Sequence, residues 1–421
     1  MRRLWQVFAS LLLVSIAGAS AFAVTTLEVV TTQETLAEWY NVQGKKFSAI
    51  YPDIVVEARV LASPNALTDH ITVRLAAGNP PDIADTVVRV YYPWADAGLL
   101  VDMQPYMKET GVLDRILPGL VQAKLYNGAL YSAPTTVDPF LTAFDAQMFA
   151  EAGIVDPYTM SRQGNWHWET GLAAAKKLTK RTADGVVTQW GWAPGNNSDW
   201  SWASYIVSNG GSLLSPDHRT VTFNQPPAIE AMEWIAELYN GHGVGKVMYF
   251  QAGPLAMGTT GTGGLQARKN AYPDADLSSA PIPAPAPGMQ SRGIMFADGP
   301  VIFDKGENKE AALKFIAWCL TEDAQKSLTE ITGRVPANMA AMIHWGQLAA
   351  HLIGGADKAH LWSDVAVHAQ LMPFGIHYAD MMKVLDAAAR SIMNGSVSAA
   401  TKLQEIAGPV QAILDGYYGG K

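Results

Sequence analysis

The chain has 421 residues and carries 38 acidic and 30 basic side chains, so its formal net charge is −8. This acidic balance disfavours nucleic acid and anionic membranes as partners, because both repel a negatively charged surface. The single cysteine, Cys319, excludes intramolecular disulfides, and the chain is long enough to bury large hydrophobic cores in two domains instead.

The first 23 residues have the order of a secretory signal peptide. Arg2 and Arg3 precede an apolar run over 7–16, and residues 21–23 form an A-x-A cleavage site. We therefore expect a mature protein that begins at Val24, has a net charge of 28 − 38 = −10, and is soluble and monomeric in the periplasm. No later run approaches the ~18 apolar residues of a membrane helix. The alternative is an N-terminal anchor that stays uncleaved.

Short apolar runs alternate with helical spacing in the next part of the chain. Thr31 and Glu34 have the spacing of a capping box, which would start the first helix. This β-α-β-α-β order predicts a parallel sheet with helices on both faces and a ligand site at the carboxyl ends of its strands. The expected elements are a strand over 27–30, a helix from 34, a strand over 54–60, a helix over 65–77 and a strand over 82–88.

Aromatic residues and glycines become frequent after about residue 137, which indicates a second domain. Cys319 lies on the apolar stripe of a long expected helix and is therefore assigned to a core. The later elements are expected as a helix over 226–239 that ends at Gly241, a strand over 294–303, a helix over 308–332 that ends at Gly333, and closing helices over 379–394 and 397–415.

Several short phrases occur in a fixed order along almost the whole chain. They are LAAGNPPD at 75–82, AGLL at 97–100, YNGALYSAP at 126–134, AAKKLT at 174–179, NGGSLL at 209–214, TEDAQ at 321–325 and TGRVP at 332–336. Each phrase alone is a weak signal, but the ordered set resembles the extracellular solute-binding proteins of family 1. These are the maltose-binding-like receptors of sugar ABC transporters.

The resemblance implies an α/β fold of the periplasmic binding protein type, with two lobes that each contain a mostly parallel sheet flanked by helices. The chain would cross between the lobes three times, near residues 136, 297 and 336. The N-terminal lobe would consist of 24–136 and 297–336, and the C-terminal lobe of 137–296 and 337–421. Closure about this hinge would capture a mono- or oligosaccharide for delivery to membrane permease subunits.

Aromatic and planar polar side chains, which suit the C–H faces and hydroxyls of a sugar, cluster in the second domain. Trp190 and Trp192 lie two residues apart, as do Trp200 and Trp202, so in strands each pair would project to one face. Asn196 lies between the two pairs. The alternative is that these rings fill the core of the second lobe.

The expected edge of the first sheet supplies further candidate ligand-binding residues. Gln33 and Glu34 follow the first strand, and Thr86, Arg89 and Trp94 lie at or beyond the end of the third. Glu34 could instead be occupied by the helix cap, and Trp94 could pack inward from a helix.

The expected crossings place four more candidates at the base of a cleft. Asp138 follows the first crossing. By resemblance, Asp298 and Gly299 correspond to the second crossing and Arg334 to the third.

A glycine-rich loop over 258–264, with Thr259 and Thr260, resembles the family loop that lines the second lobe. Relatives place a tryptophan close after this point, whereas the chain has Thr262 and Gly263.

His377 and Tyr378 precede a closing helix where relatives contribute an aromatic residue to the cleft. His377 is also one of nine scattered histidines, and a lone histidine is more often structural than a metal ligand. Motifs such as G-x-S-x-G and H-E-x-x-H do not occur, and we expect neither catalysis nor a metal nor a cofactor. The paired carboxylates of a glycosidase have no fixed spacing, so a secreted sugar-cleaving enzyme stays an alternative.

Three arginines raise another alternative, a receptor for a sugar phosphate or sugar acid, because a guanidinium grips such groups in a bidentate manner. They are Arg89, Arg292 and Arg334. Neighbouring acids could neutralise these charges, which favours an uncharged sugar. The acids concerned are Glu34, Asp138 and Asp298.

Overall fold

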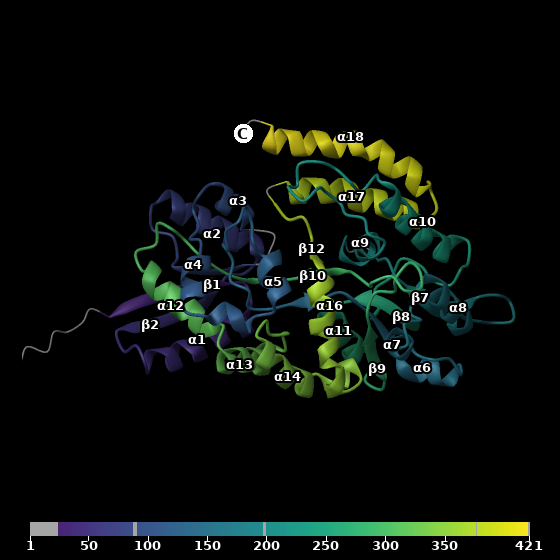
Figure 1. The fold of residues 1–421 in the computed structure, drawn as a ribbon, viewed down its shortest axis with the longest axis horizontal. Helices are drawn as coiled ribbons and strands as arrows, with labels where there is room; N and C mark the ends of the chain where they lie inside the picture. Colours follow the sequence, from purple (N-terminus) through teal and green to yellow (C-terminus); the bar gives the residue numbers. More distant parts are fainter. Residues whose placement is uncertain (1–23, 87–90, 197–198, 376, 420–421) are drawn as a thin grey trace, which may run out of the picture.

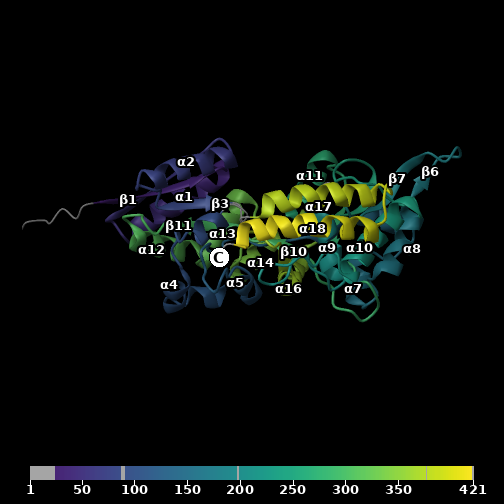
Figure 2. The same cartoon turned by 90° about the horizontal axis from the view of Figure 1, so that it is seen from above.

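The protein is described by a computed structural model over residues 24–86, 91–196, 199–375 and 377–419. Two α/β lobes lie at the two ends of its long axis, and a small sheet with several helices lies between them (Figure 1). The view from above shows the same division, with the first strands at one end and β6 (Lys180–Arg181) near the other (Figure 2).

The N-terminal lobe is built around a four-stranded sheet in the order β11-β3-β1-β2. β1 is parallel to β2 and β3, and β11 is antiparallel to β3. The strands are β1 (Thr25–Thr31), β2 (Ile54–Val60), β3 (Ile83–Thr86) and β11 (Gly299–Ile302). The helices are α1 (Glu34–Ser48), α2 (Pro64–Ala76), α3 (Tyr92–Asp96), α4 (Gln104–Glu109), η1 (Val112–Arg115), α5 (Pro118–Ala123), α12 (Lys309–Cys319) and α13 (Glu322–Thr332).

Helix α1 shows why this lobe holds together although its parts are far apart in sequence. Its buried residues Leu36, Tyr40 and Phe47 recur at helical spacing and face the core. The indole N–H of Trp39 donates a hydrogen bond of 3.0 Å to the carbonyl of Ala324 on α13. The predicted β-α-β-α-β order of the first 88 residues is confirmed as far as Thr86, where the described segment stops.

The C-terminal lobe contains a five-stranded sheet in the order β6-β7-β8-β5-β9, of which only β7 and β8 pair in parallel. Besides β6, its strands are β5 (Leu141–Asp145), β7 (Val187–Ala193), β8 (Leu255–Thr260) and β9 (Leu277–Ala280). Its helices are α6 (Ala146–Glu151), α7 (Pro157–Arg162), α8 (Trp168–Leu178), α9 (Asp199–Ser208), α10 (Pro226–Asn240), α11 (Thr262–Ala271), α17 (Tyr378–Met393) and α18 (Ala399–Tyr418).

A three-stranded sheet in the order β12-β10-β4 connects the lobes. Its strands are β4 (Asp138–Pro139), β10 (Ile294–Phe296) and β12 (Gln370–Leu371). Helices α14 (Met339–Leu348), α15 (Ala350–Ile353) and α16 (His360–His368), with η2 (Ala356–Ala359), lie beside it. α14 packs on α13 of the N-terminal lobe, whereas α15 packs on α11 and β9 of the C-terminal lobe.

Two long elements expected from the sequence are each divided in the structure. The expected strand over 294–303 is two strands, because the chain leaves β10 at Ala297 and Gly299 pairs with Thr86 in the other sheet. The expected helix over 308–332 is interrupted at Thr321, whose extended backbone starts α13. Acidic side chains in the first turn of α13 favour a new helix there.

Two local expectations are wrong. The capping box of Thr31 and Glu34 does not form, because Thr31 ends β1 with a buried side chain and Gln33 is the residue before α1. Trp200 and Trp202 lie on helix α9 and not on a strand. The assignment of Cys319 to a core is confirmed, since the residue is fully buried. Gly333 ends α13 in the left-handed conformation, as expected.

Candidate functional site

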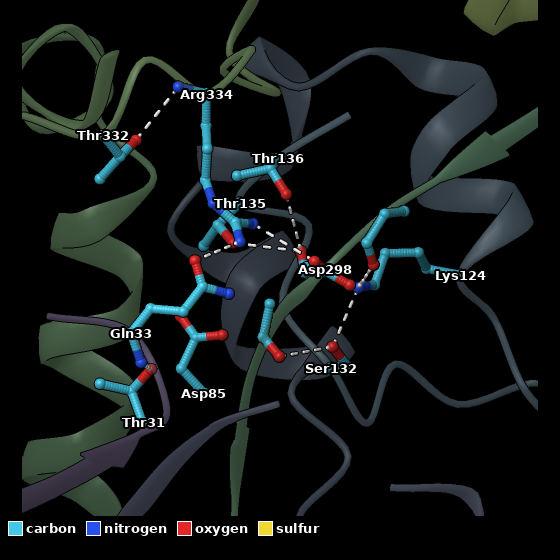
Figure 3. Close-up of polar contacts among 12 residues, drawn as sticks. Thr31, Gln33, Asp85, Lys124, Ser132, Thr135, Thr136, Asp298, Thr332 and Arg334 are labelled. Carbon is cyan, nitrogen blue, oxygen red and sulfur yellow. Dashed lines mark hydrogen bonds and ion pairs between the residues drawn. The ribbon is translucent and has the colours of Figure 1, made fainter. Parts of the chain in front are cut away.

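The three segments that connect the lobes lie side by side and bond to one another. The amide of Val137 donates to the carbonyl of Val335 at 3.1 Å, and the amide of Ala337 donates to the carbonyl of Thr135 at 3.2 Å. The hydroxyl of Thr135 donates to the carbonyl of Asp298 at 3.1 Å (Figure 3). Side chains from residues far apart in sequence therefore meet at one place between the lobes.

A pocket of about 500 Å³ opens at this junction. This volume lies within the range of small-molecule binding sites. Residues of all three connecting segments and of helix α11 line the pocket, among them Thr136, Asp138, Thr262, Phe296, Asp298 and Arg334. The pocket thus has walls that belong to different parts of the fold.

Arg334 reaches toward the N-terminal lobe from the third connecting segment (Figure 3). Its guanidinium forms an ion pair of 3.3 Å with Asp298 and donates a hydrogen bond of 2.8 Å to the side-chain oxygen of Gln33. Its backbone is held by Thr332 and by Thr329. The side chains of Arg334 and Asp298 keep 24% and 17% exposure, so the ion pair faces the pocket while both charges stay compensated.

Asp138 lines the same pocket together with helix α11. The amide of Thr262, the first residue of α11, donates a hydrogen bond of 3.0 Å to Oδ1 of Asp138. The carboxylate thereby occupies the positive end of this helix. Burial outweighs these hydrogen bonds and raises the pKa of Asp138 to about 6.

Two further ionisable side chains are buried behind the pocket. Asp85 accepts a hydrogen bond of 2.6 Å from the hydroxyl of Tyr40, and burial raises its pKa to about 6. Lys124 donates to the hydroxyl of Ser132 at 2.9 Å and to the carbonyl of Ala297 at 2.5 Å. Burial lowers the pKa of Lys124 to about 8, against the favourable charges of Asp298 and Asp85.

The structure brings four of the candidate residues together. Asp138, Asp298 and Arg334 line the pocket, and Gln33 bonds to Arg334. Gly299 follows Asp298 and pairs with Thr86, of which only the backbone is described. Glu34 lies beside Gln33 with an exposed side chain. Arg89 lies outside the described residues.

Other candidates lie in the cores and away from the pocket. Trp192 has no exposed surface and packs against Trp166, Trp234 and Tyr205. Trp94 is 7% exposed and packs on Phe303, which matches the inward alternative.

On strand β8 the two threonine candidates differ. Thr259 is buried and bonds to the hydroxyl of Tyr205 at 2.8 Å, whereas Thr260 is partly exposed at the end of the strand. Trp190 is half-buried with Lys246 over its ring. Thr260, at the carboxyl end of the strand, is thus better placed to contact a ligand than the buried Thr259.

The remaining candidates are buried beside the connecting sheet. Trp200 packs against Phe296 and Phe374, and Tyr378 also packs on Phe374. Asn196 is buried, and its backbone N–H donates a hydrogen bond of 2.9 Å to the hydroxyl of Ser201. His377 is fully buried and its Nδ1 bonds to the hydroxyl of Tyr418 at 2.9 Å. Burial lowers the pKa of His377 to about 4, so this imidazole is neutral near pH 7.

Sequence reasoning gave no role to three residues that line the pocket or lie behind it. Thr262 begins α11, and its role follows from a backbone amide that no side-chain pattern reports. Phe296 presents a half-buried ring, but the sequence placed it inside one long strand. Lys124 is a lone lysine at the end of α5, and only the fold shows that it is buried.

Among the described residues, no group of three or more histidine, cysteine, aspartate or glutamate side chains is arranged to hold a metal ion. No helix in the described part of the chain is long and apolar enough to cross a membrane.

Two α/β lobes with a pocket between them, joined by three connecting segments, define a two-lobed binding protein of the periplasmic type. The family model described as bacterial extracellular solute-binding protein matches residues 31–326. The chain therefore belongs to this family of solute-binding proteins, and the resemblance seen in the sequence is confirmed. A comparison with curated protein sequences finds no match.

Solved structures share the fold over nearly their whole length. The sugar-binding protein MalE of Xanthomonas citri aligns with a TM-score of 0.80 and 19% identity, over 93% of this chain and 98% of that one. The cyclic α-maltosyl-1,6-maltose binding protein of Arthrobacter globiformis gives 0.79 and 18%, over 93% and 99%. UgpB of Mycobacterium tuberculosis, in complex with glycerophosphocholine, gives 0.72 and 18%, over 93% and 99%.

Proposed function

We propose that this chain is the periplasmic substrate-binding subunit of an ABC importer and that it captures an uncharged mono- or oligosaccharide. The observation that carries this proposal is the pocket between the lobes, in which each charged side chain already has a partner inside the protein. Two of the similar structures are sugar-binding proteins, which supports a carbohydrate as the class of ligand.

The chemistry of the pocket suits sugar hydroxyls. Asp138 offers carboxylate oxygens as acceptors, Arg334 offers guanidinium N–H groups as donors, and the hydroxyls of Thr136 and Thr262 can do both. The half-buried ring of Phe296 supplies apolar surface for the C–H face of a sugar.

A charged sugar derivative is the alternative, and the glycerophosphocholine complex shows that this fold accommodates a phosphate-bearing ligand. Two features of this chain speak against it. Asp138 occupies the N-terminus of α11, where an anionic group would otherwise bind, and Asp298 neutralises Arg334. A phosphate would have to displace one of these carboxylates or lie beside it, which is costly in a half-buried pocket.

Capture by lobe closure follows from the proposed arrangement. We place the hinge crossings near residues 136, 297 and 336, so that 24–136 and 297–336 move against 137–296 and 337–421. Only the closed, loaded form would dock productively on the membrane permease subunits, which would use the energy of ATP. Export would depend on the signal peptide over 1–23, and the mature protein would be a monomer. Small-angle scattering with a bound sugar should then show a smaller radius of gyration.

A thermal-shift screen of the mature protein against neutral mono- and oligosaccharides, polyols and sugar phosphates tests the function. A ligand that binds only the native state adds about 2.7 kcal/mol at a concentration of 100 Kd. The proposal predicts that an uncharged saccharide stabilises the protein and is recovered unchanged after incubation. Stabilisation by phosphorylated or acidic compounds alone would favour the alternative, and cleavage products would indicate an enzyme.

A further inference from the structure

The second connecting segment is held by an unusual row of side-chain hydrogen bonds. Three consecutive carbonyl groups, at Ala297, Asp298 and Gly299, each accept a hydrogen bond from a side chain of the N-terminal lobe. The donors are Lys124 at 2.5 Å, Thr135 at 3.1 Å and Ser132 at 3.1 Å, respectively. Figure 3 shows Lys124 on the side of Asp298 away from Arg334, whereas Thr135 lies beside the Arg334 side chain.

Lys124 is the charged donor among these three side chains, and it connects the hydrogen bond at Ala297 with the one at Gly299. Its ammonium bonds to Ser132 as well as to the carbonyl of Ala297, and Ser132 in turn donates to Gly299. Lys124 is 1% exposed, and Ser132 and Ala297 are fully buried. Water therefore cannot replace a lost bond, and an unpaired carbonyl here would carry the full cost of its desolvation.

We propose that Lys124 is a positioning residue that clamps the segment Ala297–Gly299 to the N-terminal lobe and so fixes Asp298 against Arg334. The segment cannot shift easily on its other side, because a Cβ at Gly299 would already overlap the carbonyl oxygen of Ala133. Gln33, Asp298 and Arg334 then form one rigid half of the site before any ligand binds. Asp138, which is bonded to Thr262, belongs to the other half.

This inference places the flexible point of the second crossing before Ala297, at the end of β10, and not at Asp298. It rests on the proposed site, but it concerns the ligand-free protein. Lys124 faces two carboxylates, Asp85 of β3 and Asp298, while Arg334 lies on the far side of Asp298 and Tyr40 bonds to Asp85. A charged ammonium is a stronger donor than a neutral amine, so the clamp should loosen when Lys124 loses its proton.

Hydrogen–deuterium exchange of the ligand-free mature protein tests the clamp, read on a peptide that spans 294–303. Lys124→Met keeps most of the buried stem and removes the ammonium. We expect it to raise exchange of this peptide roughly 10- to 100-fold, which corresponds to one charged hydrogen bond. After correction for intrinsic rates, the wild-type peptide should also exchange faster at pH 9 than at pH 7, and the Lys124→Met peptide should show no such difference.

The control is Met107→Ala, which removes a fully buried side chain of the same lobe without touching the clamp. It should lower overall stability but leave the ratio of exchange between 294–303 and β1 unchanged. Ser132→Ala, expected to give a smaller increase, serves if Lys124→Met does not fold. Exchange within twofold of wild type in these variants would overturn the clamp. If the variants raise the exchange of 294–303 as expected but the wild-type protein binds no saccharide, the result would count against the proposed function and not against the clamp.

Discussion

Arg334 and Gln33 are joined by a hydrogen bond of 2.8 Å although 301 positions separate them in the chain. Gln33 lies between β1 and α1, and Arg334 comes directly after the end of α13. The bond brings the carboxyl edge of the first sheet to the third connecting segment. A ligand in the pocket would therefore contact a surface assembled from both ends of this lobe.

Arg334→Ala should weaken saccharide binding by roughly 1.5–3 kcal/mol, the range for a lost hydrogen bond to a charged group. The substitution also leaves Asp298 without its cation, which adds to the loss. Calorimetric titration with the best saccharide of the thermal-shift screen measures the change. Arg390→Ala, on α17 and exposed, is the matched control and should bind as wild type. Unchanged affinity in Arg334→Ala would exclude this side chain from the site.

Gly261→Ala should weaken binding while the protein stays folded. A Cβ at this position would lie 2.5 Å from Oδ2 of Asp138, so the carboxylate must move and lose its bond to the amide of Thr262. The expected loss is about 10- to 100-fold in affinity. Gly416→Ala on α18 provides the control, because a Cβ there meets no atom within 4 Å and the position does not line the pocket. Equal effects of the two substitutions would contradict the role given to Asp138.

Alanine substitutions of Trp192 and Trp190 should lower the free energy of unfolding by different amounts although the two residues lie on the same strand. Trp192 is fully buried among aromatic rings, so Trp192→Ala should cost roughly 3–5 kcal/mol in the free energy of unfolding. Trp190 is half-buried, so Trp190→Ala should lower the free energy of unfolding clearly less. Urea unfolding at constant pH measures both. Similar losses would mean that Trp192 is not the core residue described.

The pKa of Asp85 makes a prediction about stability against pH. Burial raises this pKa from 3.8 to about 6, so the folded state binds a proton more tightly than the unfolded state. The contribution of Asp85 to the free energy of unfolding is therefore fully present below pH 4 and is lost as the pH rises through 6. The loss amounts to about 3 kcal/mol, at 1.36 kcal/mol for each pKa unit.

Asp85→Asn removes this titration and keeps an acceptor for the hydroxyl of Tyr40. The difference in unfolding free energy between variant and wild type should therefore shift in favour of the variant as pH rises from 4 to 7. Urea unfolding at several pH values measures it. A difference that stays constant across this range would show that the carboxyl of Asp85 titrates normally.

The sequence predicted the first sheet well, because the short apolar runs of β1 and β2 are separated by the helical apolar spacing of α1. It also placed Asp298 and Arg334 near each other, since the family resemblance assigned both residues to crossings between the lobes. It could not tell which tryptophans are buried: Trp190 and Trp192 lie two residues apart on β7, yet Trp190 is half-buried and Trp192 has no exposed surface, because elements far away in the chain decide their burial. The ammonium of Lys124 shows the same limit, because its partners at Ser132 and Ala297 come from different segments.

We propose that an uncharged saccharide binds between the half-site of Gln33, Asp298 and Arg334 and the half-site of Asp138 and Thr262. Calorimetric titration with a matched pair, one saccharide from the screen and the same saccharide carrying a phosphate, tests it most directly. The neutral compound should bind more tightly, and its affinity should hardly change between about 0.01 and 0.1 M salt, over which the Debye length falls from about 30 to 10 Å. Tighter binding of the phosphorylated compound, weakened steeply by salt, would contradict it.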